Sequence, residues 1–265
     1  YDSNPTGPAL SFPTLSPGSD HAVIVGEITH SGGEENTVDL IWGTNATRVG
    51  TQFSDLGLLN SSTTYSYQNY LPNGSDLLLW LDADDNTTIT HSSNAVSQWN
   101  DKSGNDYHAT APSGAEPTTG SSTINGKNAL TLGSGKKISS ASPSNANWQD
   151  LYIVAKWNGG STFSNYNGLF TGTSNGSGDI GIIGNNGTDD LTSTNWFDNL
   201  YLNGSTSGIT DIMGTMSSPF LLSASANSAI SVNGYLIGND RTNGGRPWDG
   251  VVGEVLAFTT KLSDL

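Results

Sequence analysis

The second part of the chain alternates between short apolar runs and clusters of turn-forming residues. Leu77–Leu81 is wholly apolar, and in residues 151–156 the apolar side chains Leu151, Ile153 and Ala155 occupy every second position. A repeat of two residues places successive side chains on opposite faces of a strand. No segment shows the i, i+3, i+4, i+7 apolar spacing of an amphipathic helix. The pattern therefore predicts an all-β fold.

Two Asn-Gly pairs, Asn125-Gly126 and Asn233-Gly234, lie between apolar segments. Asn-Gly is strongly preferred in the two-residue turns that join antiparallel strands, so we expect a hairpin at each pair. Further short strands are predicted in residues 167–173, 179–186, 199–204, 218–226 and 250–258.

The first 75 residues differ from the rest in pattern. Residues 1–19 contain four prolines and no periodicity, which predicts an extended arm. Residues 20–75 contain three candidate strands and predict a small β unit. The alternative is that these strands extend the main domain, residues 76–265.

Composition supports the absence of long helices. Of the 24 acidic residues, 19 are Asp and 5 are Glu. Asp favours turns and Glu favours helix interiors, so this bias agrees with short strands joined by loops.

Charge excludes some classes of partner. The formal net charge is −15 and only nine residues are Lys or Arg. Contacts with nucleic-acid phosphates need Lys and Arg, so a nucleic-acid partner is not expected. No apolar run reaches the 18 residues of a membrane-spanning helix, and the absence of cysteine excludes disulfides and thiolate metal sites.

Four motifs occur in order within residues 76–265. They are LWLDA at 79–83, WNDKSG at 99–104, Asn-Gly at 233–234 and GEVLAFTTKLS at 253–263. Together they resemble the bacterial and phage branch of the laminin-G-like / concanavalin A-like lectin-glucanase superfamily. The resemblance implies a two-sheet antiparallel jelly-roll sandwich with Trp80 and Trp99 in the core. Residues 20–75 resemble a reduced fibronectin type III-like unit.

A cluster of carboxylates suggests a metal site. Asp82, Asp84 and Asp85 directly follow the apolar run, and Asp101 follows Trp99. Carboxylates on loops are ligands that Ca²⁺ prefers, which predicts a structural calcium site at these four residues. The alternative is that the side chains cap turns by accepting hydrogen bonds from nearby backbone N–H groups. The sequence leaves both interpretations open.

Three aromatic residues are candidates for ligand binding. Trp196, Phe197 and Trp248 lie in segments rich in turn-forming residues. An aromatic ring exposed on a loop offers a face on which a sugar ring stacks. The alternative is that the three rings anchor their loops to the core.

Signs of catalysis are weak. Retaining glycosidases of this superfamily carry a Glu-x-Asp-x-x-Glu string that places two carboxylates on one strand face. That string is absent here, and Glu254 stands alone in its motif. We therefore expect no enzymatic activity.

The predicted function is a non-catalytic module for glycan binding, adhesion or assembly, outside the cell or on the cell surface. Its partners are a glycan or neighbouring subunits. The alternative is a virion structural protein, a capsid decoration or fibre component, because this family branch is common in such proteins. A glycan-processing enzyme is disfavoured by the missing carboxylate pair.

The end of the chain also carries an expectation. Related modules continue beyond the LS of the last motif, which suggests that the 265 residues belong to a longer polypeptide. In that case Val251, Val255 and Phe258 are expected to be incompletely covered, and residues 1–19 to pack on a neighbouring subunit or domain.

Overall fold

The structure is a computed structural model, and it describes residues 76–144, 146–193, 195–205, 210, 212–242 and 245–262. The predicted arm and the predicted small β unit lie outside these residues, so both stay predictions. Within the described part of the chain, no helix is long and apolar enough to cross a membrane.

The described residues contain fifteen strands and one four-residue α-helix, and every pairing between the strands is antiparallel. The predicted all-β fold is therefore confirmed. The strands are β1 Leu77–Asp82, β2 Ile89–Ser92, β3 Ala95–Trp99, β4 Ala109–Thr110, β5 Thr118–Ile124, β6 Lys127–Thr131, β7 Ile138–Ser140, β8 Ala146–Trp157, β9 Gly168–Thr171, β10 Ile182–Gly184, β11 Leu191–Ser193, β12 Asn199–Leu202, β13 Phe220–Val232, β14 Tyr235–Ile237 and β15 Gly250–Phe258. The helix α1 is Met213–Met216, and 3-10 turns lie at Asn86–Thr88 and Ser177–Asp179.

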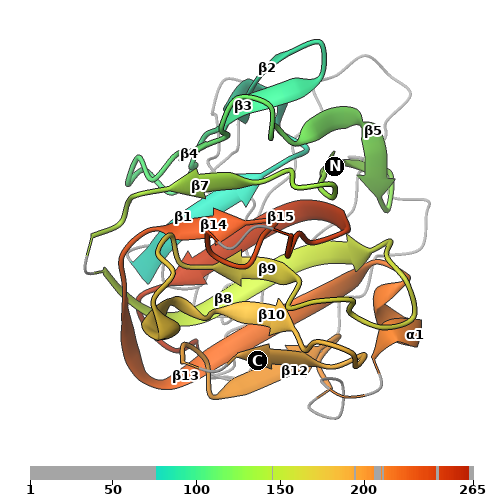
Figure 1. The fold of residues 1–265 in the computed structure, drawn as a ribbon. Coiled ribbons are helices and arrows are strands. Elements are labelled where there is room, and N and C mark those ends of the chain that lie inside the picture. Colours follow the sequence, from blue (N-terminus) through green and yellow to red (C-terminus); the bar gives the residue numbers. More distant parts are fainter. Residues whose placement is uncertain are drawn as a thin grey trace, which may run out of the picture. The chain divides into compact units, whose positions relative to one another are not determined.

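The strands form one hydrogen-bonded path in the order β11-β10-β9-β14-β7-β4-β3-β5-β6-β15-β8-β13-β12, with β1 on β15 and β2 on β3. The path curves into a nearly closed barrel. In Figure 1, β14, β9 and β10 lie in front of β8 and β13. We call β15, β8, β13 and β12 the β8 arm, and β7, β14, β9, β10 and β11 the β9 arm.

An aromatic core holds the two arms together. The ring of Trp148 on β8 lies 5.5 Å from that of Phe170 on β9 and 6.2 Å from that of Tyr235 on β14, measured between centroids. Trp148 and Tyr235 are fully buried. Large aromatic rings bury much apolar area each, so this contact is a main source of stability between the arms.

Strand β8 shows how the alternating pattern produces a buried and an outer face. Leu151, Ile153 and Ala155 are buried, and Tyr152 and Val154 between them are half-buried. The buried residues lie in the main core, as the sequence predicted.

The hairpin predicted at Asn125-Gly126 is confirmed. Ile124 and Lys127 are register partners across the turn between β5 and β6. Asn125 has φ 51° and Gly126 has φ 79°. Positive φ at both central positions is characteristic of the type I′ turn, for which Asn-Gly is the preferred pair.

The hairpin predicted at Asn233-Gly234 is wrong. Strand β13, before this pair, bonds to β8 and β12, whereas β14, after it, bonds to β7 and β9. The pair therefore carries the chain from the β8 arm to the β9 arm. The Gly234 N–H donates to the Pro143 carbonyl at 2.8 Å, and a Cβ at Gly234 would lie 2.5 Å from the Ser140 carbonyl oxygen. Glycine is needed here for close approach to another segment.

The two ends of the described segment meet. Strand β1 pairs with β15, with Leu77 opposite Phe258 and Asp82 opposite Glu254. The Thr259 N–H donates to the Asp76 carbonyl at 2.9 Å. The first and last parts of this segment are thus joined by a continuous ladder.

The expectation of incomplete cover at the last strand is wrong. Val251, Val255 and Phe258 are at most 2% exposed. Val255 lies in the main core, and Val251 packs in a cluster with Ile124 from β5. Phe258 packs in a cluster with Leu77, Trp80 and Leu262.

Candidate functional site

Two of the four predicted calcium ligands contact a lysine. The Lys102 Nζ lies 2.9 Å from Asp82 Oδ2 and 2.9 Å from Asp85 Oδ2. It also lies 4.3 Å from the centroid of the Trp80 ring, a cation–π distance. Burial alone would lower the pKa of Lys102, but the two carboxylates outweigh it and raise the pKa above its ordinary value. The structure thus brings Asp82 and Asp85 together around a positive charge.

The other two predicted ligands point elsewhere. Asp84 pairs with Lys127 Nζ at 2.8 Å and accepts a hydrogen bond from the Asn128 N–H at 2.9 Å. The buried Asp101 accepts hydrogen bonds from the backbone N–H groups of Trp80, Ser103 and Tyr107. It thereby connects the WNDKSG loop to β1.

The turn-capping alternative is observed at three of the four acids, because Asp101 also accepts from the N–H of Ser103, two residues later. Asp82 Oδ1 accepts from the Asp84 N–H at 3.0 Å, and Asp85 Oδ1 accepts from the Thr87 N–H at 3.1 Å. Among the described residues, no group of three His, Cys, Asp or Glu side chains is placed to hold a metal ion. The calcium site stays a prediction.

Glu254 lies beside these acids. It is the register partner of Asp82, and the Trp80 Nε1–H donates to its Oε1 at 2.9 Å. Burial raises the pKa of Glu254 and the nearby Asp82 raises it further, whereas Trp80 and Lys102 act in the opposite direction; the net pKa lies above the ordinary value. A cleft of about 290 Å³ is lined by both carboxylates.

We expect the substitution Glu254→Gln to raise the melting temperature at pH 7. A carboxyl with a raised folded-state pKa stabilises the protein below its unfolded-state pKa, here 4.5, and this contribution is lost as pH rises through the folded-state pKa. Glutamine keeps the oxygen that accepts from Trp80 but has no charge to desolvate. Thermal melts of both proteins at pH 4 and pH 7 test this: an advantage of the variant that is equally large at both pH values would contradict it.

The three predicted ligand-binding aromatics are core residues. Trp196 is 3% exposed, Phe197 5% and Trp248 0%, so the expectation that their rings are exposed is wrong. The Trp196 ring packs against Trp148, and its Nε1–H donates to the Gly178 carbonyl at 2.9 Å. These rings anchor turn-rich segments to the core, which was the alternative interpretation.

An exposed aromatic residue lies instead at Tyr166, in the loop between β8 and β9. Its exposed fraction is 36%. The guanidinium carbon of Arg246 lies 4.9 Å from the centroid of the ring, so the arginine covers one face. The sequence analysis did not select this residue; the available signal was a tyrosine between two asparagines in a glycine-bounded loop.

The two asparagines hold Tyr166 in place. Asn165 Nδ2 donates to the Gly245 carbonyl at 3.2 Å, and Asn167 Nδ2 donates to the Pro247 carbonyl at 2.6 Å. Both bonds therefore reach the segment that carries Arg246. The loop that carries the ring is hydrogen-bonded on each side of Tyr166, which reduces the conformational entropy lost when a ligand binds.

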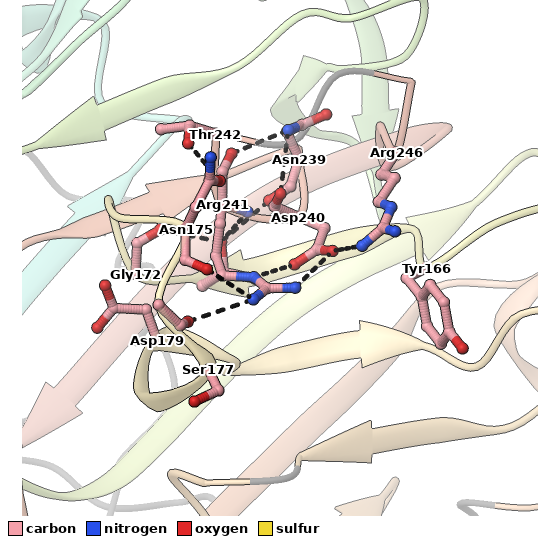
Figure 2. A network of polar contacts seen from close by, with 12 residues as sticks. Tyr166, Gly172, Asn175, Ser177, Asp179, Asn239, Asp240, Arg241, Thr242 and Arg246 are labelled. Carbon is pink, nitrogen blue, oxygen red and sulfur yellow. Dashed lines mark hydrogen bonds and ion pairs between the residues drawn. The ribbon is translucent and has the colours of Figure 1, made fainter.

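A buried ion pair orients the arginine (Figure 2). Asp240 is completely buried, and its Oδ2 lies 2.7 Å from Arg246 Nη1. Arg241 holds the same carboxylate through its Nε at 2.7 Å and its Nη2 at 3.0 Å. Burial raises the pKa of Asp240, but the two guanidinium groups outweigh it, and the pKa lies below its ordinary value. A fixed negative charge in the core thus positions Arg246 over Tyr166.

A depression of about 820 Å³ is lined by residues adjacent in sequence to Tyr166 and Arg246, although neither of these two lines it. Tyr166 is flanked in sequence by the lining residue Asn167, and Arg246 lies between the lining residues Gly245 and Pro247. The polar side chains of the depression are Ser134, Ser161, Thr162, Ser164, Asn167 and Asp249.

The Trp157 ring supports one wall of the depression. A Cβ at Gly159 would lie 2.2 Å from Cζ2 of this ring, so only glycine lets the backbone lie flat on it. The Trp157 Nε1–H donates to the Gly160 carbonyl at 3.0 Å. The wall is therefore held in a defined position by the core.

A scan against protein-family models finds no match to this chain. Searches of the curated proteins and of the solved structures also find no match.

Proposed function

We propose that this chain is a non-catalytic surface module that binds a glycan at Tyr166 and the adjacent depression. We further propose that the main domain, residues 76–265, is a two-layer jelly-roll sandwich of the laminin-G-like / concanavalin A-like superfamily. The resemblance of four motifs supports the family. The exposed and fastened ring of Tyr166 supports the site.

Several properties of the depression favour a sugar over an apolar ligand. Hydroxyl, amide and carboxylate groups line the depression, and the partly exposed Tyr166 is next in sequence to one of its lining residues, Asn167. Sugars present an apolar face of C–H groups and an edge of hydroxyls, so they need both kinds of partner. Trp157, the aromatic residue among the described lining residues, is buried, so we propose that the stacking partner is Tyr166, next in sequence to the lining residue Asn167.

We expect Tyr166→Ala to weaken glycan binding by roughly tenfold, because aromatic stacking contributes about 0.5–1.5 kcal/mol beyond the buried area. Tyr166→Phe should retain most of the affinity, since it keeps the stacking face. Isothermal titration calorimetry with β-1,4-mannohexaose and cellohexaose measures both effects.

Tyr201→Ala is a matched control. Tyr201 is a half-buried tyrosine on β12, a strand that contributes no lining residue to the depression. If the alanine substitutions at positions 166 and 201 weaken binding equally, the site is elsewhere and the proposal fails.

A further inference from the structure

We propose that Asp249 makes the depression selective for neutral sugars. Its carboxylate would accept hydrogen bonds from sugar hydroxyls and repel glycans that carry carboxylate or sulfate groups. This inference rests on the proposed function and assigns the class of ligand to the same site.

Asp249 is held in place through its backbone. Its carbonyl accepts a hydrogen bond from the Asn158 N–H at 2.8 Å, and the next residue, Gly250, begins β15. The side chain lies close to Gly133, because a Cβ there would be 3.0 Å from Asp249 Oδ1. The backbone at Asp249 is therefore fixed, and its carboxylate lies beside Gly133.

The carboxylate is available to a ligand. Asp249 is exposed and lines the depression. Within the part of the chain that the structure describes, its side chain makes no hydrogen bond or ion pair. This differs from Asp82, Asp84, Asp85 and Asp240, each of which has a cationic partner.

The other polar groups of the depression are uncharged. Among the described lining residues, Asp249 is the sole charged one. Arg246, the cation nearest in sequence, shares the buried Asp240 carboxylate with Arg241. An ionised carboxylate only accepts hydrogen bonds, and hydroxyl groups donate them, so a neutral sugar satisfies it. An acidic sugar would place like charges together, with the negative charge of the whole chain adding to the repulsion.

Matched sugars test this selectivity. β-1,4-Mannohexaose and the β-1,4-mannuronate hexamer differ only in oxidation at C6, as do cellohexaose and its C6-oxidised form. We expect the wild-type protein to bind at least one neutral hexamer about tenfold or more tightly than its acidic counterpart. In Asp249→Asn, this ratio should fall to about threefold or less, with a gain in affinity for the acidic sugar.

Asp106→Asn controls for the change in net charge. Asp106 has a side chain that is 87% exposed and lies outside the depression. Asp106→Asn changes the net charge by the same amount as Asp249→Asn, and it should keep the wild-type ratio of neutral to acidic affinity.

The two proposals fail in different ways. The role of Asp249 alone is overturned if a neutral sugar binds in a way that requires Tyr166, but neither Asp249→Asn nor Asp106→Asn changes the ratio of neutral to acidic affinity. If none of the four sugars binds, or if binding does not depend on Tyr166, the proposed function is overturned as well.

Discussion

Replacing Asp240 by alanine is expected to lower the free energy of unfolding by about 3–5 kcal/mol, because one partner of a buried ion pair would be removed. Arg241, only 8% exposed, would lose the carboxylate that its Nε and Nη2 contact. Urea denaturation followed by tryptophan fluorescence measures the loss. Glycan binding should weaken too, since Arg246 would no longer be held over Tyr166.

Lys127→Ala is the exposed counterpart of this change. The Lys127 side chain is 74% exposed in its pair with Asp84, so its removal should leave stability close to wild type. A similar loss in both variants would show that burial is not what makes the Asp240 pair strong.

The pH dependence of Asp240→Asn follows from the lowered pKa. A carboxyl with a depressed folded-state pKa adds stability above its unfolded-state pKa, here 3.8, and loses it as pH falls through the folded-state pKa. The difference in the free energy of unfolding between wild type and Asp240→Asn should therefore be largest at pH 7 and decrease in acid. A gap that grows below pH 3.8 would contradict the charge assignment.

Trp248→Ala is expected to cost about 3–5 kcal/mol of stability, since the ring is completely buried and its loss leaves a cavity. The ring packs against Trp157 at a centroid distance of 4.8 Å and against Phe163 at 6.1 Å. Chemical denaturation provides the measurement, and Tyr166→Ala, at an exposed position, should stay within about 0.5 kcal/mol of wild type.

Trp248→Phe separates ring volume from hydrogen bonding. The Trp248 Nε1–H has no hydrogen-bond partner within the described part of the chain, so phenylalanine removes volume and no bond. Its cost should be clearly smaller than that of alanine. Equal costs for the two variants would mean that the cavity does not determine the loss.

Local patterns predicted the strands well because they depend on neighbouring residues. The alternation in β8 and the Asn125-Gly126 turn each express a preference that needs only a few adjacent residues. The Asn233-Gly234 pair has the same local sequence signal but a different outcome. Its conformation depends on Pro143 and Ser140, some 90 residues earlier in the chain. A prediction from neighbouring residues does not include such a distant contact.

The candidate site was harder to predict for a related reason. Turn-forming neighbours suggested that Trp196 and Trp248 were exposed, but the arms of the fold close over both rings. The setting of Tyr166 depends on Arg246, which lies 80 residues later and covers its ring, and on Asp240, which holds that arginine. Asp84, Asp85 and Asp101 lie outside the strands and Asp82 ends β1, whereas the lysine between Asp82 and Asp85 comes from a different motif.

The hydrogen bond from the Thr259 N–H to the Asp76 carbonyl determines how the main domain responds to mechanical load. The two residues lie at the same end of the antiparallel pair β1–β15. A pull on the chain before Asp76 and after Thr259 therefore opens the ladder one hydrogen bond at a time, starting at Leu77 and Phe258, instead of loading all the bonds together. Such peeling needs little force, so we expect β1 to be the first strand to detach when the chain is pulled from these two points.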